Sequence, residues 1–153
     1  MAELRRQFDS EFARAPQTES VPFEDFLAIR VGVEPYALRL TEVAGLVADK
    51  AVTRLPGAPP GLLGISGFRG EIVSVFDLRV LLGSAGGEPP RWLVLTAADS
   101  TVGLAFDQFE GHVRVPQDAV VGTPGAELVR VGEAVRPIVR IPSVLHAIKQ
   151  RTR

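Results

Sequence analysis

The residue types that carry out most protein chemistry are sparse in this sequence of 153 residues. It has no cysteine and only two histidines, His112 and His146, so the usual spacing of a zinc site is absent. His112 alternates with Val113 and Val115, a pattern that predicts an exposed position on a strand. We therefore expect no metal and no cofactor.

The common catalytic motifs are also missing. The nearest approach to a Gly-x-Ser-x-Gly nucleophile motif is 64–67, Gly-Ile-Ser-Gly, whose second glycine comes one place too early. Neither Lys50 nor Lys149 follows a glycine, so there is no phosphate-binding loop of the Gly-Lys-Ser/Thr type. The acidic residues are scattered and form no close carboxylate pair of the glycosidase kind. The sequence predicts a protein that is not an enzyme.

The segment 61–83 has the most distinctive pattern in the chain. Gly61, Gly64, Gly67 and Gly70 are spaced three residues apart and precede an apolar run that begins at residue 72. Glycines at this spacing indicate positive φ angles or a close backbone approach just before a strand. The segment therefore predicts a surface whose shape is set by the backbone.

Two charged residues stand out in the same segment. Arg69 stands between bulky Phe68 and Gly70, and its guanidinium could bind a partner's carboxylate or act as an internal strut to Asp77. The sequence leaves both readings open. Asp77 precedes the leucine-rich run 78–82 and is a natural helix N-cap, which would turn the three leucines of that run toward the core.

From residue 25 onward, short apolar runs bounded by Gly, Pro and Asp follow one another as in an all-β domain. The expected strands are 26–31, 36–40, 46–53, 72–76, 92–96, 102–106, 112–115, 128–131 and 135–141. The run 102–106 alternates as a half-buried strand should, whereas 92–95 is apolar on both sides and fits between two layers. No strand-helix-strand alternation is visible, so the pattern favours a barrel or sandwich.

The expected organisation is one N-terminal element followed by one domain. Leu4, Phe8 and Phe12 recur every fourth residue among charges, which predicts an amphipathic helix and spacer over 1–20. This helix could pack on its own domain or dock to a partner. Residues 21–150 are expected to form a single domain of two halves, with the Gly/Pro-rich loop 83–91 near their boundary.

Charge gives little indication of a partner. Seventeen basic residues balance 18 acidic ones, so no strong field attracts nucleic acid or an anionic membrane. The charged N-terminus lacks an apolar signal-peptide region and no stretch is long enough to span a membrane, so a cytoplasmic location is expected. A nucleic-acid or ligand-binding β-barrel remains an alternative if the arginines of the C-terminal half line up on neighbouring strands; these are Arg114, Arg130, Arg136 and Arg140.

The motif in segment 61–83 also resembles a known family. Gly64, then Gly-Phe-Arg-Gly at 67–70, an apolar run, Asp-Leu-Arg at 77–79 and Leu-Gly at 82–83 are similar to the signature of the CheW-like chemotaxis coupling proteins. The resemblance covers roughly residues 25–148 and is closest up to residue 83. It implies an all-β fold with short helices, in which two small five-stranded SH3-like β-barrels pack side by side, followed by a C-terminal helix.

The resemblance implies a non-catalytic adaptor in a signalling array. Such a protein couples the cytoplasmic tip of a methyl-accepting chemoreceptor to the regulatory domain of a chemotaxis histidine kinase. Receptor contact is expected around the groove between the barrels, near Val43 and at Arg69, and kinase contact at apolar barrel edges and ends. The implied partner-binding residues are Val43, Gly45, Leu46, Gly64, Arg69 and Gly70, with extra docking by Leu4, Phe8 and Phe12.

The chain departs from the family pattern at several positions. Gly67 replaces the usual Asn, Phe68 replaces Leu, Gly45 stands where Glu is frequent, and Ser74 stands where Pro is frequent. These departures keep a second reading open, that of a diverged member that has lost kinase or receptor binding and serves another motility pathway. Gly45 also removes an acidic side chain from the expected contact surface.

Overall fold

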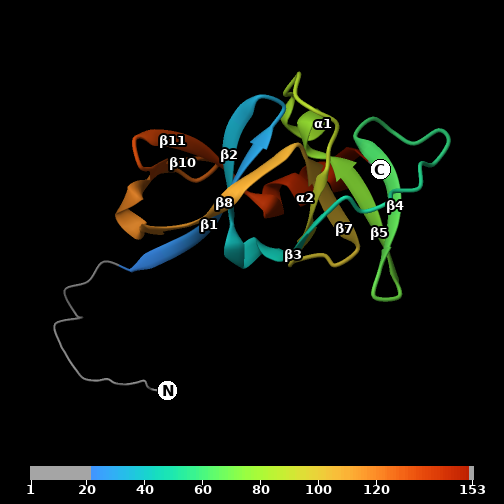
Figure 1. The fold of residues 1–153 in the computed structure, drawn as a ribbon, viewed down its shortest axis with the longest axis horizontal. Coiled ribbons are helices and arrows are strands. Elements are labelled where there is room, and N and C mark those ends of the chain that lie inside the picture. The colour runs from blue at the N-terminus through green and yellow to red at the C-terminus, as the bar shows by residue number, and fades with distance from the viewer. Residues whose placement is uncertain (1–21, 152–153) are drawn as a thin grey trace, which may run out of the picture.

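The computed structural model describes residues 22–151, which form two β-sheets and a few short helices (Figure 1). One sheet has six strands in the order β8-β1-β2-β11-β10-β9, and the other has five in the order β3-β6-β7-β5-β4. The six strands are β1 (Phe23–Val31), β2 (Glu34–Arg39), β8 (Gln108–Pro116), β9 (Val120–Thr123), β10 (Ala126–Val131) and β11 (Ala134–Val139). The five are β3 (Val43–Ala48), β4 (Leu62–Phe68), β5 (Glu71–Asp77), β6 (Trp92–Thr96) and β7 (Val102–Phe106).

The helical elements are short and lie at the joints of the chain. They are the 3-10 helices η2 (Leu40–Glu42) and η3 (Gln117–Ala119) and the α-helices α1 (Leu78–Leu82) and α2 (Ile141–Arg151). The expected C-terminal helix is therefore present as α2. The expected N-terminal helix, with Leu4, Phe8 and Phe12, falls outside the described residues. No helix within 22–151 is long and apolar enough to cross a membrane.

The predicted all-β fold in two halves is confirmed, with two differences in detail. One half has six strands rather than five, and neither sheet's ladder of paired strands returns to its first strand to close a barrel. The halves are also interleaved in sequence, because the chain enters the five-stranded half after η2 and leaves it after β7. The loop 83–91 joins α1 to β6, so it lies inside the five-stranded half (Figure 1).

The main hydrophobic core lies where the two sheets meet. Ile29 and Leu38 from the six-stranded sheet pack there with Leu104 and Phe106 of β7, all fully buried. The inner face of α2 covers this core with Val144, Leu145 and Ile148, and Figure 1 shows α2 in the middle of the molecule. The two sheets therefore share one core rather than forming independent domains.

A second layer of apolar contacts lies on the other side of β6 and β7. Leu93 and Ala105 face a cluster with Val73, whereas Val94 faces the main core, so β6 lies between two layers as predicted. β7 is buried on both sides and not half-buried as its alternation suggested. Gly103 makes this possible, because a Cβ at that position would lie 2.9 Å from Leu93 Cδ1.

Two strands were not expected from the sequence. β4 was interpreted as a glycine-rich turn, because glycines within a strand weaken the usual strand signal. β9 has four residues and ends in the Gly-Thr pair 122–123, which gives too short a pattern to recognise. Three expected strands also end earlier than predicted: β2 stops at Arg39 because Leu40 begins η2, β3 stops before Asp49, which has a φ of 58°, and β11 stops before Ile141, which begins α2.

The short helix α1 is capped as predicted. Asp77 Oδ1 accepts a hydrogen bond from the Arg79 backbone N–H at 2.9 Å, and the Arg79 guanidinium reaches Asp77 Oδ2 at 3.3 Å. Leu78 is fully buried, and Leu81 and Leu82 pack against the main core. The carboxylate of Asp77 is thus fully occupied within its own helix.

Ion pairs tie the strands of the six-stranded sheet together. Arg39 of β2 contacts Glu24 of β1 at 2.8 Å and Glu127 of β10 at 3.2 Å. Burial would lower the pKa of Arg39, but its hydrogen bonds to Glu127 and Glu24 outweigh burial and raise that pKa above its ordinary value. This side chain therefore stays charged and links three strands.

A second ionic cluster lies at the β1–β8–β11 junction. Arg136 donates to the backbone oxygens of Ile29 and Tyr36 and to Glu110, which also accepts from Arg30 at 2.8 Å. The hydrogen bonds from Arg30 and Arg136 lower the pKa of Glu110. The six-stranded half is therefore joined by charged side chains as well as by its backbone ladder.

Candidate partner-binding groove

The β4–β5 hairpin carries Arg69 at its tip. Phe68 pairs with Glu71, so only Arg69 and Gly70 form the turn, with φ angles of 49° and 81°. Two consecutive positive φ angles are those of the tight hairpin turn that follows the natural twist of paired strands. Gly70 adopts this conformation freely, and the turn projects the Arg69 side chain into solvent.

The start of β4 is joined to the segment that follows β3. Thr53 and Ile65 exchange two backbone hydrogen bonds of 2.8 and 2.9 Å, and Ser66 Oγ donates to Ala51 O at 2.7 Å. Gly64 has a φ of 155°, and a Cβ there would lie 2.1 Å from Thr53 O. Gly64 thus permits this joint, which we call the seam, and the seam connects the two edges of the five-stranded sheet at one end only.

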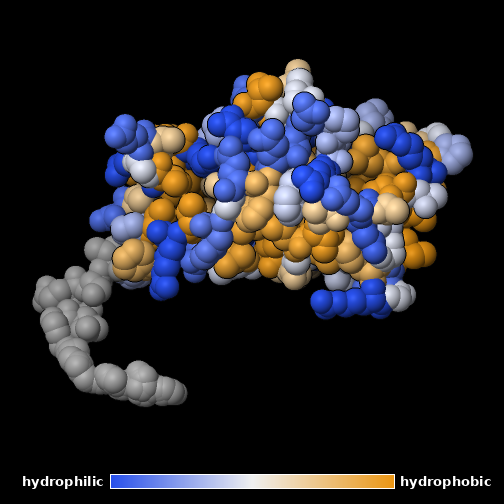
Figure 2. Space-filling model, viewed as in Figure 1, coloured by the Kyte–Doolittle hydropathy of each residue, from blue (hydrophilic) through white to orange (hydrophobic). Residues whose placement is uncertain are grey.

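Beyond the seam, the two edges leave an open groove of about 460 Å³. We call it the seam groove. Its lining residues come from β3, the β4–β5 hairpin, the end of β6 and the turn that follows it, and they are Ala44, Gly45, Leu46, Val47, Phe68, Arg69, Glu71, Val73, Leu95, Thr96 and Ser100. The floor is apolar and the rim carries one basic and one acidic side chain. In Figure 2, hydrophobic side chains gather over the right-hand part of the face shown, where β4 and β5 lie in Figure 1, and hydrophilic atoms project at the hairpin tip.

Three of the six expected partner-binding residues line this groove, Gly45, Leu46 and Arg69, and of these Leu46 also packs against the main core. The other three lie elsewhere. Val43 is partly buried and packs against the main core, Gly64 lies in the seam, and Gly70 forms the exposed tip of the turn. The sequence analysis therefore identified residues of one region. It did not separate the residues whose side chains face outward from the glycines that allow the backbone conformation.

The two readings of Arg69 can be compared with its surroundings. Asp77, the suggested partner for an internal strut, pairs with Arg79 instead. Arg69 is exposed and makes no hydrogen bond or ion pair with any residue in 22–151. Its guanidinium is thus available at the rim of the groove.

The sequence analysis did not identify most of the residues that form the groove floor. Val73 and Leu95 line it from β5 and β6, and Phe68 closes one side with the Lys50 ammonium 4.5 Å from its ring centroid. Alternation in β5 could have indicated Val73, because Val73 and Val75 share one face of that strand. Nothing local in the sequence brings Leu95 beside Phe68.

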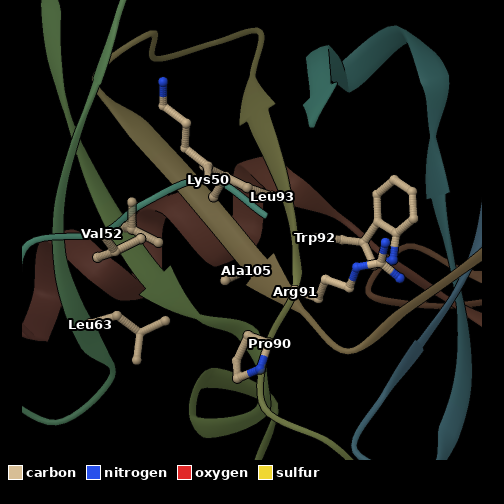
Figure 3. A pocket seen from close by; sticks show the side chains of 9 residues that line it. Lys50, Val52, Leu63, Pro90, Arg91, Trp92, Leu93 and Ala105 are labelled. Atoms are coloured by element: carbon tan, nitrogen blue, oxygen red, sulfur yellow. The ribbon is translucent and has the colours of Figure 1, made fainter. Parts of the chain in front are cut away.

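A second, much smaller hollow opens on the same layer of the five-stranded half (Figure 3). Figure 3 shows Val52, Leu63 and Pro90 around it, with Arg91 against the Trp92 ring to one side. Its volume of about 40 Å³ has room for a water molecule and not for an organic ligand, whose sites are roughly 300–1,000 Å³. This hollow gives no support to a ligand-binding function.

A third hollow of about 260 Å³ lies at the junction of the two halves. We call it the inter-sheet hollow. It is lined by Thr41, Glu42, Ala97, Ala98, Ile141 and Pro142. Glu42 Oε1 accepts a hydrogen bond from the Ile141 N–H at 3.0 Å, so its carboxylate caps the first turn of α2 and fixes the helix beside η2.

The two histidines lie on the surface, away from these hollows. His112 is half exposed and its Nε2 lies 2.9 Å from Asp25 Oδ1, as expected for the outer face of a strand. His146 is exposed beside Gln150. Among the residues that the structure describes, no group of three His, Cys, Asp or Glu side chains could hold a metal ion.

The four arginines of the C-terminal half do not form one free strip. Arg136 is largely buried and donates to Ile29 and Tyr36 carbonyls, and Arg114 lies over the Phe23 ring at 5.4 Å. A basic strip for nucleic acid would need these cations on one open face. The arrangement removes the main observation that favoured a nucleic-acid-binding barrel.

Comparison with known proteins decides the family. The model of the CheW-like domain matches residues 25–148, which is most of the chain. The chain belongs to the CheW-like family. Its observed fold and the resemblance of its 61–83 segment therefore agree with the family match.

Several known proteins are similar in sequence. The chemotaxis protein CheW of Helicobacter pylori is 24% identical over 115 residues, which cover 73% of this chain and 70% of that protein. CheW of Bacillus subtilis is 26% identical over 104 residues, covering 66% and 67%, and protein FrzA of Myxococcus xanthus is 26% identical over 114 residues, covering 72% and 71%.

A solved CheW-like structure is also similar. The scaffolding protein TtCheW from Thermoanaerobacter tengcongensis superimposes with a TM-score of 0.66 at 19% identity, covering 75% of this chain and 87% of that one. At this level of identity the match shows the fold. Membership of the CheW-like family in turn supports an adaptor role in chemotaxis-type signalling.

Proposed function

We propose that this protein is a non-catalytic adaptor that couples a chemoreceptor to a chemotaxis-type histidine kinase. Family membership supports this role, and the seam groove supplies a surface suited to it. The observation that carries the proposal is an apolar groove with an exposed Arg69 at its rim that pairs with no residue in 22–151, on a fold shared with a scaffolding protein.

We assign the seam groove to the kinase's regulatory domain, whereas the family resemblance implies a receptor contact for Arg69. Val47, Phe68 and Leu95 are only partly buried and offer apolar contact area at the groove. Reversible protein interfaces depend on a few such anchors surrounded by polar residues, and Arg69 supplies a guanidinium for a carboxylate of the partner. An assembly that must form and dissociate needs a modest interface of this kind.

The inter-sheet hollow is the surface that we assign to the receptor tip. It lies beside Val43, at the junction of both halves, and its walls come from η2, the β6–β7 turn and α2. The two hollows share no residue, but Thr96 and Ser100 of the seam groove flank Ala97 and Ala98 of the inter-sheet hollow, so the two proposed surfaces are neighbours. The working location that follows is the cytoplasm, with recruitment to membrane-associated receptor arrays.

The experiment is a calorimetric titration of the full chain with the regulatory domain of the chemosensory kinase from the same cell, followed by the receptor's cytoplasmic tip. Micromolar binding of both partners, with the second binding undiminished by the first, is expected. Binding of the receptor alone would instead indicate a diverged family member that serves another motility pathway, and binding of neither would overturn the adaptor role.

A further inference from the structure

A hollow of about 340 Å³ lies where the chain enters the described fold. We call it the entry hollow, and its lining residues are Phe23, Glu24, Asp25, Leu40, Thr41 and Gln117. The Gln117 N–H donates a hydrogen bond of 2.8 Å to the carbonyl oxygen of Pro22, so the chain is held against the wall of this hollow where residues 1–21 join it. The segment 1–21 is therefore tethered at the edge of the hollow.

The entry hollow leaves two large apolar side chains uncovered. Phe23 is 53% exposed, although Arg114 lies over its ring at 5.4 Å, and Leu40 is 39% exposed. A volume of this size falls within the roughly 300–1,000 Å³ of sites that take organic groups, so it has room for an aromatic side chain. The hollow is accordingly suited to an apolar occupant.

The charged residues of the lining are both acidic. Glu24 accepts a hydrogen bond from Arg39 at 2.8 Å, and Asp25 Oδ1 lies 2.9 Å from His112 Nε2. An ionised carboxylate has about four lone-pair sites, so each of the two can accept a further donor. An occupant with a basic side chain beside its apolar ones would therefore complement the hollow in charge.

The sequence before Pro22 has this composition. Leu4, Phe8 and Phe12 form an apolar stripe at every fourth position, and Arg14 follows soon after its last member. The chain from Phe12 to Pro22 can span up to about 33 Å, which allows the stripe to turn back to the hollow. A short tether gives an effective concentration of about a millimolar, so even a weak contact populates a docked state.

We propose that the segment 1–20 folds back onto its own chain and places Phe8 and Phe12 in the entry hollow, against Phe23 and Leu40. The entry hollow shares Thr41 with the inter-sheet hollow, which is the surface assigned to the receptor tip. A docked segment therefore stands beside the receptor surface and competes with the receptor for access to it. This competition rests on the proposed function, whereas the docking itself does not.

A second apolar surface competes with the entry hollow for the same segment. Val121, Leu128 and Val135 are exposed on one face of β9, β10 and β11. The entry hollow is favoured because Phe23 and Gln117 belong to its lining, and these residues adjoin and bind Pro22. The experiment has to separate these two surfaces.

A direct test is possible because the chain has no cysteine, so Ser10→Cys supplies a single site for a nitroxide label. Nuclear magnetic resonance of the full chain then reports which amide signals the label broadens. We expect stronger broadening at Leu40 and Thr41 than at Leu128 and Val135. Broadening that is strongest at Leu128 and Val135 would overturn docking in the entry hollow.

Two exposed leucines provide matched variants of the labelled chain. Leu40 is 39% exposed and Leu128 is 36% exposed, so Leu40→Ser and Leu128→Ser remove similar side chains from similar positions. Leu40→Ser is expected to reduce the broadening at Thr41 at least twofold, and Leu128→Ser is expected to leave it unchanged. Thermal melts check the fold of both variants. Equal broadening in the two would contradict the proposal.

Variants within the segment keep the test decisive if Leu40→Ser does not fold. The pair Phe8→Ser and Phe12→Ser removes the stripe and is expected to abolish the broadening. The pair Arg6→Ser and Asp9→Ser changes two polar residues at equal net charge and is the control. Broadening that persists without the stripe would overturn the docking. So would broadening of an unlabelled chain by a labelled one at the same positions, because the occupant would then be a second copy.

Calorimetric titration with the receptor's cytoplasmic tip tests the competition. Without the stripe, the Phe8→Ser and Phe12→Ser chain is expected to bind about threefold more tightly than the parent, because docking lowers the fraction of chains competent to bind. The Arg6→Ser and Asp9→Ser control is expected to bind like the parent. Equal affinities of all three chains would overturn the competition and leave the adaptor role standing. Failure of all three to bind would overturn the receptor assignment, while the label experiment still decides the docking.

Discussion

The two halves of the molecule are held together by different means. In the six-stranded half, Arg39 and Arg136 are largely buried and link neighbouring strands through carboxylates and backbone oxygens. In the five-stranded half, the described ion pairs are the helix cap Arg79–Asp77 and the exposed pair Arg91–Asp49. Neither of these crosses the gap between β3 and β4.

This difference indicates which half is free to bind. Where charged groups already satisfy one another across strands, a partner would have to displace them at a cost. Where the edges are joined only at the seam, an apolar floor and an unpaired arginine remain accessible. We therefore propose that the kinase-binding surface lies in the five-stranded half and that the six-stranded half supports it.

The largest effect is expected from breaking the seam with Gly64→Ala. The added methyl group would lie 2.1 Å from Thr53 O at a φ of 155°, so the seam must open or the strand must shift. We expect a loss of about 3 kcal/mol in the free energy of unfolding, measured by urea denaturation. Gly67→Ala, in the same strand with open space around it, is the control and should change stability by less than about 0.5 kcal/mol. Equal effects of the two substitutions would show that the seam is not a constraint.

Arg136→Ala tests the support provided by the other half. It leaves the carbonyls of Ile29 and Tyr36 and the carboxylate of Glu110 without their donor. We expect a loss of about 2 kcal/mol in urea denaturation. The comparison variant is Arg130→Ala, on the exposed face of the neighbouring strand β10, which should be nearly neutral. A stability as high as that of the parent would contradict a structural role for this cluster.

A smaller, pH-dependent effect is expected for Glu110→Gln. The pKa of Glu110 is lowered by its hydrogen bonds from Arg30 and Arg136, so its contribution to stability is fully present above its ordinary pKa of about 4.5. That contribution is lost as the pH falls through the lower pKa of the folded state. Thermal melts should therefore show the variant less stable than the parent at pH 7, with the difference shrinking below about pH 4.5. A difference that stays constant down to pH 3 would show that the carboxylate's charge is not responsible.

Local features of the fold could be predicted from the sequence. Asp77 before a leucine run specifies a capped helix within a few residues, and the apolar run of β6 specifies a strand between two layers. These predictions succeeded because neighbouring residues alone determine them. β4 was missed because Gly64 and Gly67 lack the side chains by which a strand is recognised, although the backbone there is extended.

The candidate site could be predicted only in part, because it depends on pairing between distant segments. Gly45 lies on β3, at one edge of the five-stranded sheet, and Arg69 follows β4, at the other edge. Both line the same groove, and this depends on the order of the strands, which includes the parallel pairing of β5 with β7. Arg136 was a candidate for a basic strip, but the pairing of β11 with β2 turns it inward. Which side chains face outward is thus a property of the sheet order, which the sequence pattern does not show.

The central claim is that the kinase-binding surface lies in the five-stranded half and not in the six-stranded half. The most direct test is a calorimetric titration of the kinase's regulatory domain with Arg69→Glu and with Arg130→Glu, two equal charge reversals at exposed arginines, one in each half. The account predicts at least tenfold weaker binding for Arg69→Glu, binding within twofold of the parent for Arg130→Glu, and unchanged melting temperatures for both. Parent-like binding by Arg69→Glu, or an equal loss in both variants, would contradict it.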